Sequence, residues 1–193
     1  MSIVLVGSTS GSITLQEPAV AGTTTIDLPA TSGTALVAPT ALTVPNTTGT
    51  VMVSGNMPAF SAYRTGANQS ISNNTRTVVQ YNAEYFDTNS NYDTSTYRFT
   101  PTVAGYYQVN FVVGCNGTSV SYCESSILKN GSVFKFYGLI NATIGSGAYL
   151  TGSDVIYMNG TTDYLQVAGY ITAVSGTAFS SDSGWSACLL RTA

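Results

Sequence analysis

The residues best suited to chemistry are four oxygen-bearing side chains spaced two apart in one short segment. Asp87, Asn89, Asn91 and Asp93 form this motif. Calcium and other hard cations bind carboxylate and amide oxygens, but a complete calcium loop of this kind also has a central Gly and a terminal Glu, and this segment has neither. Asp and Asn are also common in ordinary turns, because they tolerate left-handed geometry and form local hydrogen bonds. We interpret the motif first as a turn, with a calcium site as the alternative.

The composition disfavours catalysis. The 193 residues include no histidine, which is the commonest general base and the commonest metal ligand. The cysteines Cys115, Cys123 and Cys188 have no spacing typical of a disulfide framework or a metal site. A glycan-cleaving spike would need a pair of carboxylates, and no spacing selects one. The acidic residues available in the aromatic part of the chain are Glu84, Asp87, Asp93, Glu124, Asp154, Asp163 and Asp182. We therefore expect no enzymatic activity and no cofactor.

The charge pattern excludes further classes of protein. Only 8% of residues are charged, the net charge is −3, and the six basic residues are scattered. A nucleic-acid interface needs a concentration of Lys and Arg, so we expect no nucleic-acid partner. The N-terminus has no basic segment before an apolar run, and no apolar run approaches the length of a membrane span, so we expect folding in a cytoplasm without membrane insertion. Sparse charge also lowers the repulsion between copies of the chain.

Period-two patterns predict the elements that position these residues. Tyr107, Val109, Phe111, Val113 and Cys115 form one inward face, and Leu165, Val167, Gly169 and Ile171 form another. Further strands are predicted at 77–86, 133–140 and 185–191, and no segment has helical spacing. Turn-forming clusters separate the strands. Residues 56–193 are therefore expected to form an all-β antiparallel sandwich.

Tyrosines supply the candidate contact residues. The chain has thirteen, and four are assigned to outward faces of the predicted strands. These four are Tyr106, Tyr137, Tyr164 and Tyr170. Outward aromatic side chains are typical of protein interfaces, where they bury a large area at low entropic cost. The same rings can stack on sugars. Both a subunit contact and a ligand contact remain open for them.

Residues 1–55 have a different composition and predict a separate segment. They have only two charged residues, Glu17 and Asp27, and no aromatic residue. Residues 26–37 align with residues 42–53, each unit being a short strand, a Pro-x-Thr-x-Gly turn and a second short strand. A two-stranded unit cannot bury a face alone, so it must pack against other copies. A Ser/Thr-rich tail without regular structure is the alternative.

Several strings in the second segment resemble the TNF-like jelly roll, specifically the globular head of complement component one, subcomponent q. Residues 91–107 (NYDTSTYRFTPTVAGYY) match the entry into that family's central strand. Residues 128–131 (LKNG), 155–167 and 184–190 match its following turn, late strands and closing strand, although the family's Gly-Asp turn here reads Gly160-Thr-Thr-Asp163. The resemblance covers about 130 residues and implies a jelly-roll fold and a homotrimer.

Residues 11–34 of the first segment resemble repeats common in phage fibre and capsid-surface proteins. The two resemblances together imply a structural protein of a phage virion. We expect a homotrimeric capsid-surface decoration or head-fibre protein, whose arm (residues 1–55) contacts other virion proteins and whose head is exposed on the virion surface after assembly in the host cytoplasm. The alternatives are a short tail fibre that recognises a host surface glycan or protein, and a bacterial surface adhesin.

Overall fold

The computed structural model describes residues 3–6, 12–15 and 57–193. The chain divides into two units, residues 1–47 and 48–193, and each is described by itself. In the first unit, β1 (Ile3–Val6) pairs antiparallel with β2 (Ser12–Leu15), with Ile3 opposite Leu15. The predicted repeat at 26–53 and the predicted boundary between 55 and 56 lie outside the described residues.

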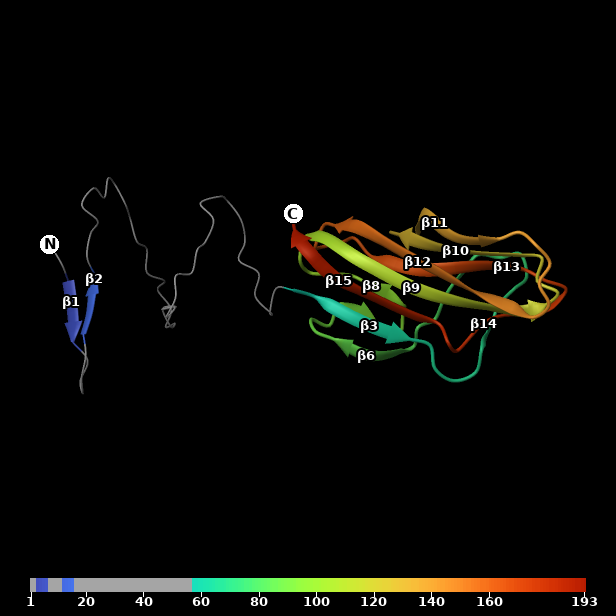
Figure 1. Ribbon diagram of the computed structural model, residues 1–193, viewed down its shortest axis with the longest axis horizontal. Coiled ribbons are helices and arrows are strands. Elements are labelled where there is room, and N and C mark those ends of the chain that lie inside the picture. Colours follow the sequence, from blue (N-terminus) through green and yellow to red (C-terminus); the bar gives the residue numbers. More distant parts are fainter. Residues whose placement is uncertain (1–2, 7–11, 16–56) are drawn as a thin grey trace. The chain divides into compact units, whose positions relative to one another are not determined.

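The second unit is an antiparallel sandwich of two sheets, which confirms the predicted all-β fold (Figure 1). In the first sheet β9 is central, with β12 on one side and, on the other, β15, β3 and β6 in order; β14 and β4 extend this sheet. Its strands are β3 (Ala59–Tyr63), β4 (Gln69–Ser70), β6 (Ala83–Asp87), β9 (Gly105–Thr118), β12 (Gly147–Met158), β14 (Ser175–Phe179) and β15 (Gly184–Thr192).

The second sheet has the order β11-β10-β13-β8-β7, and β5 pairs with β13 beside this path. Its strands are β5 (Thr77–Val78), β7 (Tyr92–Asp93), β8 (Arg98–Phe99), β10 (Tyr122–Lys129), β11 (Ser132–Ile140) and β13 (Leu165–Thr172). Within the described ranges, no helix is long and apolar enough to cross a membrane.

The predicted inward faces are confirmed. Along β9 the odd-numbered side chains from Tyr107 to Cys115 are buried, whereas Tyr106 and Asn110 are exposed. Along β13 the side chains of Leu165, Val167 and Ile171 are likewise buried. Successive residues of a strand point to opposite faces, so an alternating sequence places one set between the sheets and the other set outside.

The turn between β10 and β11 is set by two residues with positive φ. Asn130 has φ 54° and Gly131 has φ 80°, the combination that a two-residue hairpin turn requires. The Asn130 amide also joins this turn to the loop before β13. Its Nδ2 donates to Asp163 Oδ1 at 2.8 Å, and its Oδ1 accepts from the Tyr164 N–H at 2.9 Å. The turn predicted at residues 128–131 is therefore confirmed.

The prediction of one strand over 77–86 was wrong. The segment contains two strands in different sheets: β5 pairs with β13, and β6 pairs with β3. Between them Val79 and Tyr81 are fully buried, and the Tyr81 hydroxyl donates to the Val112 carbonyl at 3.1 Å. The chain crosses from one sheet to the other here. A period-two pattern identifies the buried side chains but not the sheet to which each half of the segment pairs.

An aromatic cluster fills one part of the space between the sheets. The Phe60 ring lies 4.8 Å from Tyr92, 4.6 Å from Phe99 and 5.0 Å from Trp185, measured between ring centroids. The first two pairs are stacked and the third is edge-on. Phe60 is 1% exposed, so its ring makes contacts on all sides. These contacts join β3 and β15 of one sheet to β7 and β8 of the other.

We expect Phe60→Ala to lower the free energy of unfolding by about 3–5 kcal/mol, because it removes a buried ring and leaves a cavity. The matched control is Phe86→Ala, since Phe86 is 50% exposed on the neighbouring strand β6. That control should cost about 0.5 kcal/mol or less. Urea unfolding of both variants measures the difference. Equal losses would show that the aromatic cluster does not anchor the sandwich.

Candidate functional site

The carboxylate of Asp87, the first residue of the predicted turn or calcium motif, bonds to backbone N–H groups of its own loop. Its Oδ1 accepts from the Asn89 N–H at 3.2 Å, and its Oδ2 accepts from the Tyr92 N–H at 2.7 Å. Asn91 Oδ1 accepts from the Thr102 N–H at 2.7 Å. The two Asp87 bonds are local bonds of the kind by which Asp stabilises turns, whereas the Asn91 bond joins this loop to the segment before β9.

Asp93 caps the next turn of the chain. Its Oδ1 accepts from the N–H and the hydroxyl of Ser95 at 2.7 and 2.6 Å, and its Oδ2 accepts from the Thr96 hydroxyl at 2.8 Å. The Ser95 and Thr96 donors stabilise the ionised form and lower the pKa of Asp93 to about 2. A calcium ion at this motif would have to replace these donors. Across the described ranges, no group of three or more Cys, Asp or Glu side chains is arranged to hold a metal ion.

The four candidate tyrosines lie at separate places. Tyr106 is 41% exposed on β9, with its ring 5.5 Å from that of Tyr157 on β12. Tyr137 differs from its predicted outward position. Its ring is half-buried edge-on to Phe111 at 5.3 Å, and its hydroxyl donates to Asp154 Oδ2 at 2.8 Å.

Tyr164 and Tyr170 belong to the second sheet and its loops. The Arg98 guanidinium lies 4.1 Å from the centre of the half-buried Tyr164 ring. Tyr170 lies edge-on to Tyr122 at 5.7 Å. The structure therefore does not bring the four predicted tyrosines together on one surface.

Two apolar patches are exposed on the head instead. The face patch consists of Tyr106, Val155 and Tyr157, on neighbouring strands β9 and β12. The edge patch lies on β11, the last strand of its sheet, and consists of Val133, Phe134, Phe136 and Leu139. Sequence analysis identified only Tyr106 among these. The alternation of β12, in which the odd-numbered residues from 149 to 157 are exposed, was the signal that could have revealed Val155 and Tyr157.

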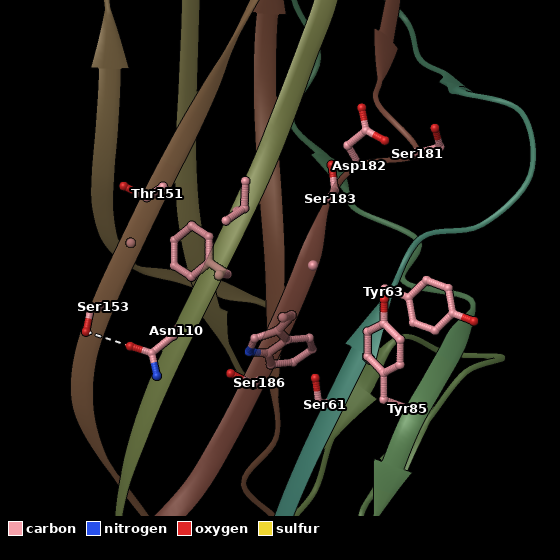
Figure 2. A pocket seen from close by; sticks show the side chains of 16 residues that line it. Ser61, Tyr63, Tyr85, Asn110, Thr151, Ser153, Ser181, Asp182, Ser183 and Ser186 are labelled. Carbon is pink, nitrogen blue, oxygen red and sulfur yellow. Dashed lines mark hydrogen bonds between the residues drawn. The ribbon is translucent and has the colours of Figure 1, made fainter.

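A groove of about 760 Å³ lies on the outer side of the first sheet, and its lining combines hydroxyl, amide and aromatic side chains. Figure 2 shows Tyr63 and Tyr85 on one flank and Asn110 and Ser153 on the other. The hydroxyl residues that line it are Ser61, Thr151, Ser153, Ser181, Ser183 and Ser186. Strands β3, β6, β9, β12 and β15 all contribute, so the groove exists only because the first sheet places them next to one another.

The groove has a fixed aromatic flank and a fixed carboxylate. The rings of Tyr63 and Tyr85 are stacked with centroids 4.3 Å apart, and Tyr85 is 73% exposed. Asp182 Oδ2 accepts from the Tyr149 hydroxyl at 2.9 Å. The Ser180 hydroxyl donates to the same oxygen at 3.4 Å, and Asp182 Oδ1 accepts no hydrogen bond from the part of the chain that the structure describes. Sequence analysis did not identify the groove, because its residues are isolated positions on different strands.

A second cleft, of about 400 Å³, lies on the other sheet beside Tyr170. Here Arg76 forms an ion pair with the buried carboxylate of Glu124 and donates to the Ser126 hydroxyl at 2.8 Å. The Tyr122 hydroxyl donates to the same carboxylate at 2.8 Å, which raises the pKa of Tyr122. Since the two charges neutralise each other, the cleft presents no net charge to a ligand.

Comparison with known proteins identifies the fold. No family model matches the chain, and no curated protein matches it. The globular domain of the zebrafish complement 1qA protein is similar over 70% of this chain and 99% of its own, with a TM-score of 0.52 and 15% identity. Murine APRIL at pH 8.5 is similar over 69% of this chain and 99% of its own, with a TM-score of 0.52 and 9% identity. At such identities the likeness shows the fold, which confirms the predicted jelly-roll sandwich of the complement and TNF type.

We expect the double variant Asp87→Ala, Asp93→Ala to melt at a lower temperature than the wild type, because several loop N–H and hydroxyl donors lose their acceptors. The loss should be identical with and without EDTA, and EDTA should not change the melting temperature of the wild type. Differential scanning calorimetry in calcium and in EDTA measures all four values. A large EDTA-dependent drop that the double variant abolishes would establish a structural calcium site.

Proposed function

We propose that this chain is a non-catalytic structural protein of a phage virion. Three copies assemble through the heads, the arm of residues 1–55 attaches the trimer to the capsid, and the heads are exposed on the virion surface after assembly in the host cytoplasm. The observation that carries the proposal is the presence of two distinct exposed apolar patches on one sandwich. The proposal for the arm rests on its resemblance to repeats of phage fibre and capsid-surface proteins.

The two patches suit contact between identical copies. An exposed apolar cluster marks an interaction surface. An edge strand with exposed aromatic side chains also needs a cover, because its free N–H and C=O groups pair readily with other chains. The face patch of β9 and β12 and the edge patch of β11 are different surfaces. When one surface of a copy binds the other surface of the next, the contact is heterologous, and it closes into a ring of three when the rotation between neighbouring copies is one third of a turn.

Family and composition support a ring of three. Domains of the complement and TNF type often assemble as trimers. The chain carries only 8% charged residues, so little repulsion opposes the approach of identical copies. Two basic groups lie beside the face patch: the Arg191 guanidinium is 5.7 Å from the centre of the Tyr106 ring, and the Lys129 ammonium is 5.7 Å from the centre of the Tyr157 ring.

We expect the full chain to have a mass of about 60 kDa in solution, three times the 20.1 kDa chain. Tyr157→Asp in the face patch and Phe136→Asp in the edge patch should each prevent ring closure, because each buries a charge at the contact. The matched control is Val174→Asp, since Val174 is 77% exposed and belongs to neither patch. Light scattering at micromolar concentration measures all masses.

Mixing the two disrupted variants tests the heterologous geometry. Tyr157→Asp keeps an intact edge patch and Phe136→Asp keeps an intact face patch. A mixture should therefore form a heterodimer through one undisturbed contact. A wild-type monomer, or a mixture in which no heterodimer forms, would contradict this assembly.

We expect a chain without residues 1–55 to keep a trimeric head and to be missing from purified particles, because the capsid contact is assigned to the arm. A whole-particle reconstruction with the full chain should show density for the trimer on the capsid, and particles with the truncated chain should lack it. Density on the tail would instead identify a tail fibre. Incorporation of the truncated chain would place the attachment in the head, and absence of the full chain from particles would favour an adhesin.

A further inference from the structure

We propose that the groove on the first sheet binds neutral, hydroxyl-rich glycans. This function goes beyond a structural role in a virion and does not depend on where in the particle the chain is placed. The groove combines three features on one surface: hydrogen-bonding groups without protein partners, an aromatic flank, and the absence of basic side chains from its lining.

The unpartnered groups match sugar hydroxyls. In the described part of the chain, nothing accepts a hydrogen bond from the amide Nδ2 of Asn110, and the hydroxyls of Ser61 and Thr151 bond to no other group. An amide nitrogen is a donor, and a serine or threonine hydroxyl can both donate and accept. A sugar hydroxyl likewise donates and accepts, so it can pair with each of these groups.

Two side chains of the groove, Asn110 and Asp182, are held in position by hydrogen bonds within the protein. The Ser153 hydroxyl donates to Asn110 Oδ1 at 2.9 Å, which orients the Asn110 amide (Figure 2). Tyr149 holds Asp182 by one carboxylate oxygen and leaves the other as an acceptor. Preorganisation of this kind reduces the entropy lost on binding. It also sets a fixed spacing between an amide donor and a carboxylate acceptor.

The aromatic flank supplies the apolar part of the site. A sugar ring has one face of C–H groups, which packs on the face of an aromatic side chain and is otherwise poorly bound by hydroxyl groups. Because Tyr63 and Tyr85 are stacked on each other, the orientation of the exposed Tyr85 ring is constrained. Binding sites for small molecules commonly combine such an apolar surface with a few placed polar groups.

The charge of the groove selects the class of glycan. Asp182 is the one charged residue among those that line it, and no Lys or Arg is present there. Sulfate, phosphate and carboxylate groups are recognised in proteins chiefly by Arg and Lys, so an acidic glycan would meet a carboxylate without a counter-charge. The chemistry therefore favours neutral sugars.

The groove is separate from the face patch on the same sheet. Tyr106 is opposite Tyr157 in the β9–β12 register, whereas Asn110 is opposite Ser153 and Val112 is opposite Thr151. The two sets of residues follow one another along the strands and share no member. If three heads assemble, three grooves are linked, and multivalent binding strengthens the attachment to a repeating polysaccharide.

The experiment titrates the full chain with four defined probes: an α-glucan heptasaccharide, a tetramer of β-linked N-acetylglucosamine, an α-mannan fragment and polysialic acid. At least one neutral probe should bind with a Kd of about 1 mM or lower. Tyr85→Ala and Asn110→Ala should each lower its association constant by about tenfold or more. Tyr164→Ala, a tyrosine deletion on the other sheet, should leave it unchanged. Calorimetry and light scattering are run on the same samples.

The scattering data separate this proposal from the proposed trimer. Groove variants that keep the wild-type mass but lose sugar binding support a glycan site, whatever that mass is. Failure of all three neutral probes to bind, undiminished binding by both groove variants, or tighter binding of polysialic acid would each overturn the proposal. A groove variant with a changed mass would assign the groove to a subunit contact and overturn it as well.

Discussion

Contact between the rings of Phe60, Tyr92, Phe99 and Trp185 holds the two sheets of the head together where its strands are shortest. β7 and β8 have two residues each, so backbone pairing alone contributes little to their position. Each aromatic side chain buries a large apolar area, and stacked or edge-on pairs add further stabilisation. Phe60 contacts the other three rings directly. The loop of residues 87–93 is consequently tied at its C-terminal end to a rigid core.

The tyrosines in and beside this cluster have hydrogen-bonded hydroxyl groups. Buried hydroxyls cost free energy unless they are hydrogen-bonded. The Tyr92 hydroxyl donates to the Tyr81 carbonyl at 2.8 Å, and the Tyr107 hydroxyl donates to the Val103 carbonyl at 2.7 Å. These bonds connect the cluster to the crossing segment and to the start of β9. The outward residues of β9 and β12 take no part in this packing, and they form an apolar patch at one end and line the groove farther along.

The few charged residues act mainly within the structure. Asp163 accepts from the Asn130 amide at 2.8 Å and pairs with Lys129 at 2.9 Å, and these contacts hold its pKa below the usual range. Lys135 and, to a lesser extent, Tyr137 donate hydrogen bonds to the Asp154 carboxylate and lower its pKa. An acid whose pKa is lowered stays ionised at neutral pH and is a poor proton donor.

The sequence alone determined which faces of β9 and β13 are buried, because side chains alternate along a strand and the apolar set of each of these strands packs between the sheets. It also determined the Asn130–Gly131 turn, since few residues tolerate positive φ, and its family resemblance identified the jelly roll. It did not determine which strands are neighbours. The crossing at Val79–Tyr81, the packing of Tyr137 against Phe111 and the groove formed by Tyr85, Asn110 and Ser153 all depend on pairing between distant segments. Periodicity is a local property of the chain, whereas a site on a sheet face is built from residues that only the tertiary structure brings together.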